Sequence, residues 1–170
     1  MGNSKTYRGK INNVFSRLLP VVTADAHCDI PCGIYDAIPA KIAAMTVLRM
    51  VLQIHELKSP DTADAAATVA FGNSMSRRCM VKEQHAAVCK EELLILWTDF
   101  FKPEHTEKYP NLHDTFWKAA KLCSKNKQEV NDDAARQLVA AVDEIAKIFY
   151  EVKGAPERYE AYKTITDKLF

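Results

Sequence analysis

Apolar residues recur at helical spacing along most of the chain, and the apolar–polar alternation that marks a strand is missing. Four segments carry this spacing, and turn-forming residues such as prolines lie between several of them. Four helices with short connections predict an all-α protein, folded as an antiparallel up-and-down four-helix bundle. The predicted helices are residues 37–57, 61–101, 104–123 and 132–153.

The four segments differ in how many faces they would bury. Residues 37–57 are apolar over a wide arc, which indicates burial on more than one side. We expect an interruption of residues 61–101 near Gly72, followed by a stripe at heptad spacing. The other two helices show one stripe each. The predicted stripes are Val81, Val88 and Ile95 with Met80, Ala87, Leu94 and Phe101 beside them; Leu112, Phe116, Ala119 and Cys123; and Leu138, Val142, Ile145 and Phe149.

Composition is that of one ordinary folded domain. The chain has 170 residues, 48% of them hydrophobic, which is enough for a core. The net charge is +1, and neither a basic tract nor a run of about 18 apolar residues occurs, so we expect no nucleic-acid and no membrane partner. Three of the five cysteines fall in predicted helices, where buried free thiols are typical: Cys79, Cys89 and Cys123.

The strongest chemical feature is one imidazole and two thiols within six residues, His27, Cys28 and Cys32. Pro31 and Gly33 favour a tight turn that brings both sulfurs together. Small residues precede His27 and fit a cleavage that would free its α-amine as a further ligand. The Cys28 amide could supply a second nitrogen. Two nitrogens and two thiolates in a plane favour Ni(II) or Cu(II) over zinc. Two cysteines at this spacing are otherwise structural thiols, zinc ligands or a redox pair.

Residues 27–35 resemble the metal hook of nickel-containing superoxide dismutases, whose mature chains begin His-Cys-Asp-x-Pro-Cys-Gly-x-Tyr. Residues 97–103 and 107–110 resemble two later segments of that family, in the same order. The resemblance implies a superoxide dismutase that cycles one nickel ion per chain between Ni(II) and Ni(III). It also implies a four-helix fold that assembles as a homohexamer.

The resemblance further implies the residues of the site. The nickel ligands would be the α-amine of His27, the amide nitrogen and thiolate of Cys28, and the thiolate of Cys32, with the His27 imidazole as an axial ligand. Tyr35 matches a tyrosine beside the open face of the metal, where it would position superoxide or water or limit access. An aromatic packed where hook meets bundle is the alternative for Tyr35. Asp29 is expected to cap the turn of the hook.

Three positions depart from the family pattern and alter polar support for the axial imidazole. Ala43 stands where the family has a glutamate, His85 where it has an arginine, and Phe100 where it has a second tyrosine. A metal-bound imidazole usually needs a hydrogen-bond acceptor to fix its orientation. We hypothesise that His85 or a backbone carbonyl replaces the glutamate. The remaining histidines are expected to be surface or core-edge residues: His55, His105 and His113.

Domain organisation follows from these features. Residues 1–26 hold four Lys or Arg and one Asp, and we expect a pro-segment that a protease removes between Ala26 and His27. Its apolar stretch is too short for a secretory signal, so we expect a cytoplasmic protein, with an organelle as the alternative if this segment is a transit peptide. The hook would span 27–35, the bundle 36–153, and an extension 154–170. For that extension, a short amphipathic helix or an interface strap is expected.

Three classes of function remain open from the sequence. The first is the nickel superoxide dismutase. The second is a non-catalytic bundle that binds nickel or copper for delivery or storage, an alternative that the missing glutamate at position 43 keeps open. The third is a helical interaction protein whose cysteines play no part in function.

Overall fold

Helices account for all the regular secondary structure in residues 33–170, the part of the chain that the computed structural model describes. No strand occurs in this range, so the all-α prediction is confirmed there. Residues 34–170 form one compact unit. Its elements are α2 (Ile38–His55), α3 (Ala65–Ile95), the π-helical turn η2 (Leu96–Phe100), α4 (Pro103–Lys108), α5 (Leu112–Gln128), α6 (Asp132–Val152) and α7 (Glu157–Thr164).

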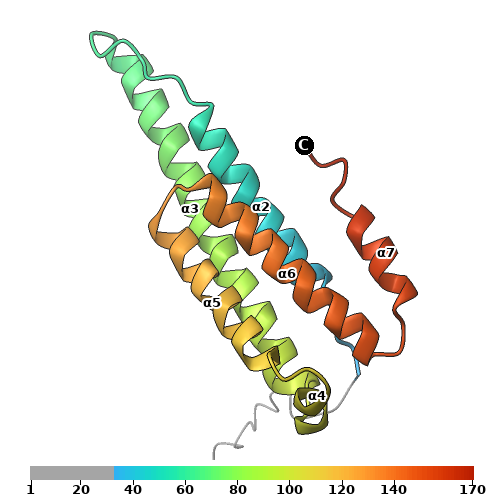
Figure 1. The fold of residues 1–170 in the computed structure, drawn as a ribbon. Coiled ribbons are helices and arrows are strands. Elements are labelled where there is room, and N and C mark those ends of the chain that lie inside the picture. Colours follow the sequence, from blue (N-terminus) through green and yellow to red (C-terminus); the bar gives the residue numbers. More distant parts are fainter. Residues whose placement is uncertain (1–32) are drawn as a thin grey trace, which may run out of the picture. The chain divides into compact units, whose positions relative to one another are not determined.

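The four long helices make a closed ring of contacts. Helix α2 packs against α3 and α6, and α5 packs against the same two helices. Figure 1 shows that each long helix runs opposite to the one before it, with α7 lying outside this group near α6. None of the helices in residues 33–170 combines the length and apolar character that a membrane-spanning helix needs.

The core lies where the apolar stripes of the four helices meet. The stripes predicted for residues 104–123 and 132–153 are confirmed, since each of their residues is at most 3% exposed. Helix α2 is buried against both neighbours through small residues such as Ala44 and Val47, while Ile42 on its outer side stays 40% exposed. Cys89 and Cys123 are free, fully buried thiols in this core, and Cys79 is half-buried.

Helix α3 buries a different face from the one predicted. The bundle uses the face that carries Ala86, Cys89 and Leu93, each at most 1% exposed. Three residues of the predicted stripe lie at the surface instead: Met80 (51% exposed), Val88 (41%) and Leu94 (42%). The prediction failed because α3 is apolar on two faces, and sequence spacing does not tell which face the neighbouring helices cover.

The interruption predicted near Gly72 was also wrong. Helix α3 is continuous over 31 residues and passes through Gly72 and Asn73. Glycine costs about 1 kcal/mol in a helix interior, but it retains both backbone hydrogen-bonding groups, unlike proline. The Ser76 hydroxyl even donates a further hydrogen bond to the Gly72 carbonyl, at 2.8 Å.

The single helix predicted over 104–123 is two helices. Helix α4 ends at Lys108, and α5 begins at Leu112. Pro110 has no amide hydrogen, and it disfavours helical geometry at Tyr109, whose φ and ψ are −123° and 79°. Just before α4, the π-helical turn closes with a hydrogen bond from the Phe101 amide to the Leu96 carbonyl at 3.1 Å.

Candidate metal centre

The predicted ligands His27, Cys28 and Cys32 lie outside the described residues, as does Asp29. The structure describes the chain that follows them. Gly33 has a φ of +70°, a left-handed conformation that glycine adopts without strain. Tyr35 and Asp36, which we call the hook base, lie between Gly33 and α2.

Tyr35 is half-buried against an aromatic cluster at the end of η2. Its ring centroid lies 5.8 Å from that of Phe100, which in turn lies 4.6 Å from the ring of Phe149 on α6. Lys153 donates a hydrogen bond from Nζ to the Tyr35 carbonyl oxygen at 2.6 Å. The structure therefore gives Tyr35 a packing role and fixes its backbone, three residues after Cys32.

Hydrogen bonds of Asp36 link the hook base to the start of α2, to α6 and to α7. Its Oδ1 accepts hydrogen bonds from the Ile38 amide (3.1 Å) and from the Tyr150 hydroxyl (2.6 Å). Its Oδ2 accepts from the Arg158 guanidinium at 2.9 Å. Burial, together with the neighbouring Asp36 carboxylate, raises the pKa of Tyr150, which therefore remains a hydrogen-bond donor throughout the neutral range. Sequence reasoning missed this role of Asp36, because Tyr150 and Arg158 are more than 100 residues away in the chain.

The three departures from the family pattern fall on α2, α3 and η2. Ala43 is 2% exposed and has no polar group to offer. Phe100 contacts Tyr35, so the structure brings these two predicted positions together. His85 lies fifteen residues before Phe100, roughly 22 Å of helix rise away. Its Nδ1 is buried and has no hydrogen-bond partner among the described residues.

His105 contacts the same aromatic cluster, which the sequence analysis did not predict. Its ring stacks on Phe100 with centroids 6.1 Å apart, and its Nδ1 accepts the Lys102 amide hydrogen at 3.0 Å. The neutral imidazole therefore carries its proton on Nε2. No sequence signal distinguishes His105 from His55, because the bend between η2 and α4 alone brings it to Phe100.

Other chemical features of residues 33–170 lie apart from the hook base. No group of three or more His, Cys, Asp or Glu side chains in this range could hold a metal ion. Cys89 and Cys123 belong to the core, and their mutual hydrogen bond together with burial raises the pKa of the Cys89 thiol. The same hydrogen bond lowers the pKa of the Cys123 thiol, so Cys89 is the partner that keeps its proton.

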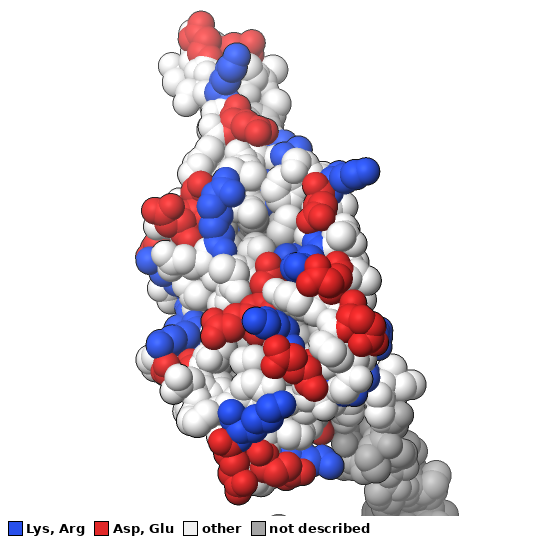
Figure 2. All heavy atoms as spheres, turned by 45° about the vertical axis from the view of Figure 1, so that its right-hand side comes forward, with Lys and Arg blue, Asp and Glu red and all other residues white. Residues whose placement is uncertain are grey.

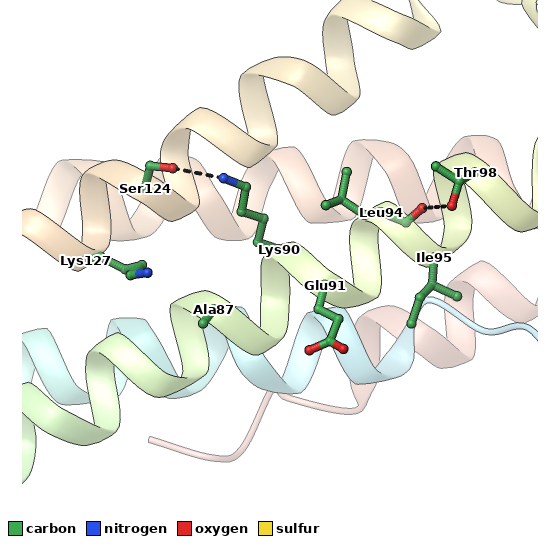
Figure 3. Close-up of a pocket in the computed structure, with 8 residues that line it drawn as sticks. All are labelled: Ala87, Lys90, Glu91, Leu94, Ile95, Thr98, Ser124 and Lys127. Carbon is green, nitrogen blue, oxygen red and sulfur yellow. Dashed lines mark hydrogen bonds between the residues drawn. The ribbon is translucent and has the colours of Figure 1, made fainter. Parts of the chain in front are cut away.

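A groove of about 340 Å³ runs along α3 and α5 (Figure 3). Lys90 crosses it and donates to the Ser124 hydroxyl at 3.3 Å, and Leu94 and Lys127 lie beside it. Neither Tyr35 nor His85, the predicted site residues that the structure describes, lines this groove. Figure 2 shows another face of the molecule, where Lys and Arg are interspersed with Asp and Glu and form no extended positive surface.

Comparison with known proteins decides the family. The sequence pattern of nickel-containing superoxide dismutases matches residues 22–153. The chain belongs to this family. Helices α2 to α6, the aromatic cluster and the hook base fall within the matched residues.

Individual relatives agree with this assignment. The chain is 34% identical over 143 residues to "Superoxide dismutase [Ni]" of Streptomyces coelicolor and 35% identical over the same length to that of Streptomyces seoulensis. Each alignment covers 84% of this chain and 100% of the relative. The resemblance identified from residues 27–35 is thereby confirmed.

Solved structures show the same fold. The native structure of a nickel superoxide dismutase superposes with a TM-score of 0.65 at 32% identity, covering 76% of this chain and 100% of that one. A nickel-containing superoxide dismutase with ligation corresponding to the oxidised state gives a TM-score of 0.62 at 33% identity, with the same coverage. The family match ends at residue 153, so α7 and the residues after it lie beyond it.

Proposed function

We propose that the mature chain disproportionates superoxide to dioxygen and hydrogen peroxide, with one nickel ion bound per chain. Family membership over residues 22–153 carries this conclusion. Relatives that cover most of this chain are named as enzymes, which favours catalysis over a bundle that only stores or delivers metal. Bound nickel supplies the redox couple that accepts an electron from one superoxide and returns one to another.

The proposed ligands are His27, Cys28 and Cys32. Two thiolates, an α-amine and a deprotonated amide would hold the ion, with the His27 imidazole as a further donor, and this nitrogen and sulfur set suits nickel. Metal binding favours the deprotonated forms of all these groups. Residues 27–32 would thus supply every proposed nickel ligand, and no helix of the bundle needs to add one.

Tyr35 is proposed as the residue that positions superoxide or water beside the metal. Lys153 holds its backbone and Phe100 supports its ring, so the phenol is presented from a fixed base. Because Phe100 has no hydroxyl where the family has a tyrosine, Tyr35 is the phenol proposed for this site. The two protons consumed per turnover would come through water and this hydroxyl.

Support for the axial imidazole is proposed to come from His85 or a backbone carbonyl, with Asp29 capping the turn of the hook. The buried Nδ1 of His85 has no partner among the described residues, which makes it available as an acceptor. Its position fifteen residues before Phe100 favours the backbone carbonyl of the two. Ala43 cannot serve, because its side chain has no acceptor.

Maturation is proposed to remove residues 1–26 by cleavage between Ala26 and His27, leaving the hook, the bundle over 36–153 and the extension over 154–170. We also propose assembly into a homohexamer. The exposed apolar side chains on α3 and α5 support such contacts: Met80, Val88, Leu94 and Trp117. The proposed compartment is the cytoplasm, with an organelle as the alternative.

The decisive experiment compares a chain that begins at His27 with the full-length chain. We expect one nickel per chain and rapid superoxide decay only for the chain that begins at His27. Cys28→Ser and Cys32→Ser should each abolish nickel retention and activity, whereas Cys79→Ser, a half-buried thiol on α3, should retain both. Full activity of the Cys28→Ser or Cys32→Ser chain would refute the proposed site, and nickel without turnover would indicate storage.

A further inference from the structure

Residues 154–170, which we call the C-terminal strap, fold back along the bundle. Gly154 has a φ of +72°, and the Ala155 amide donates to the Tyr150 carbonyl at 3.0 Å, which ends α6 in a reversing turn. Helix α7 then returns beside α6, and its Tyr162 is only 1% exposed (Figure 1). The family match ends at residue 153, so this packing is a feature that family membership does not explain.

The first attachment of the strap is a partly buried polar cluster. The Tyr162 hydroxyl donates to Asp143 Oδ1 at 2.7 Å, and Lys41 Nζ donates to both carboxylate oxygens of Asp143, at 2.7 and 2.9 Å. Lys41 is 5% exposed and its Nζ also lies 5.4 Å from the Tyr162 ring centroid. This cluster joins α7 to α6 and α2, so the strap is fastened to the helix that follows the hook.

The second attachment reaches the hook base itself. Arg158, in the first turn of α7, donates to Asp36 Oδ2 at 2.9 Å, opposite the oxygen that accepts from Tyr150 and the Ile38 amide. The guanidinium carbon also lies 5.5 Å from the ring centroid of Tyr150. With Arg158 in place both carboxylate oxygens of Asp36 are hydrogen-bonded, and the side chain is held from two directions.

The placement of Asp36 makes this contact relevant to the metal. Asp36 follows Tyr35 directly and comes four residues after Cys32, a span of at most about 14 Å of chain. Movement of Asp36 would therefore displace Tyr35 and the Cys32 thiolate, because so few residues separate them. Precise positioning of such groups matters, because small displacements lower the rate of a pre-organised site.

We propose that the C-terminal strap positions the hook base, with Arg158 as a positioning residue that acts through Asp36. This inference rests on the proposed function for its consequence at nickel, while the contact itself belongs to the described structure. Removing Arg158 leaves one oxygen of Asp36 without its partner and loosens residues 34–38. With the hook base held less firmly, we expect nickel to be released faster.

The test uses Arg158→Ala in the chain that begins at His27. Without nickel, we expect amide hydrogen exchange over residues 34–38 to be about two to five times faster, the size expected for losing a partly exposed ion pair. With nickel, the rate of metal release to a chelator should rise by a similar factor while the metal content stays at one per chain. Arg158→Lys should restore both rates in part.

The matched control is Arg136→Ala. Arg136 pairs with Asp132 at 3.0 Å on α6, so this variant also loses one exposed ion pair but does not touch Asp36. It should leave both rates unchanged. A second variant that ends at Lys153 removes the strap and should release nickel at least as fast as Arg158→Ala.

The possible outcomes separate this inference from the proposed function. Unchanged exchange at residues 34–38 in Arg158→Ala would overturn the contact, and faster exchange with unchanged nickel release would overturn the positioning role. A parent chain beginning at His27 that binds nickel but does not consume superoxide would defeat the proposed catalysis and leave the release measurement valid. A parent that binds no nickel would defeat both.

Discussion

Lys82 places a charged side chain inside the bundle, with only 2% of it exposed. Its Nζ donates to the carbonyl oxygens of Asn126, Lys127 (3.2 Å) and Glu129 (2.9 Å). The first two carbonyls belong to the last turn of α5, where no later residue of the helix can pair with them, and the third belongs to the residue that follows the helix. Lys82 therefore acts as a cap supplied by a neighbouring helix, which local sequence cannot reveal.

Replacing Lys82 with methionine should lower the free energy of unfolding by about 1–3 kcal/mol, because the carbonyls lose a charged donor while the volume is kept. Denaturant titration of the apo chain measures this. Lys90→Met is the matched control, since Lys90 lies on the same helix and donates only to the Ser124 hydroxyl at 3.3 Å. It should change stability by less than about 0.5 kcal/mol. Equal losses in the two variants would refute a capping role.

The burial of Lys82 also predicts that the free energy of unfolding depends on pH. Burial lowers the pKa of Lys82 from its usual 10.5. Between the folded pKa and 10.5 the unfolded chain binds more protons, so the contribution of Lys82 to stability increases as pH rises through that window. The stability difference between wild type and Lys82→Met should therefore grow as the pH rises toward 10.5. A difference that shrinks over this range would contradict the direction of the shift.

At the scale of the elements, sequence and structure together explain where α5 and α6 begin. Helix α6 begins after Asn131, whose side chain accepts the Ala134 amide hydrogen at 2.9 Å. Asn111 stands at the same position before α5, yet its side chain makes no capping hydrogen bond. Asparagine is generally favoured at this position, and the backbone geometry separates these two residues.

This difference gives a matched pair of variants. Asn131→Ala should destabilise the chain by about 1 kcal/mol, because an amide at the start of α6 loses its acceptor. Asn111→Ala should cost much less, since no hydrogen bond is lost. Thermal or denaturant unfolding of both variants measures the difference, and similar losses would show that the cap of α6 contributes nothing specific.

The elements also show where sequence reasoning succeeds. The stripe of α6 was predicted residue by residue, because one apolar face at regular spacing has a single way to be buried. The face of α3 was not, because Val88 and Cys89 both continue apolar stripes and the position of α5 decides between them. The split at Pro110 was missed although proline marks it and every residue of the predicted stripe follows it.

At the scale of the molecule, the candidate site divides into a local and a distant part. The local part, residues 27–35, was recognisable from sequence because all its donors are contiguous. The distant part was not, since Asp36 meets Arg158, and Tyr35 meets Phe100 and Lys153, only after the bundle closes. Fold class needed no such contacts, because helical periodicity sets it segment by segment.

The contiguity of the ligands has a consequence for stability. A ligand stabilises a protein only to the extent that it binds the folded state better than the unfolded state. His27, Cys28 and Cys32 lie within six residues, so an unfolded chain that begins at His27 retains every proposed nickel donor. Residues 34–170 form a compact unit with a core of their own, and they should stay folded without metal.

Nickel at a hundred times its dissociation constant would add about 2.7 kcal/mol if only the folded chain bound it, which shifts Tm by roughly 5–11 °C at this size. Because the unfolded chain keeps all the proposed ligands and can also bind nickel, we expect the Tm to shift by less than about 3 °C. The contacts of the hook base should account for most of this shift. Calorimetry of the chain beginning at His27, with and without nickel, measures this. The full-length chain, whose His27 nitrogen is in a peptide bond, is the control and should show no shift. A shift of the full size would mean that the bundle itself completes the metal site.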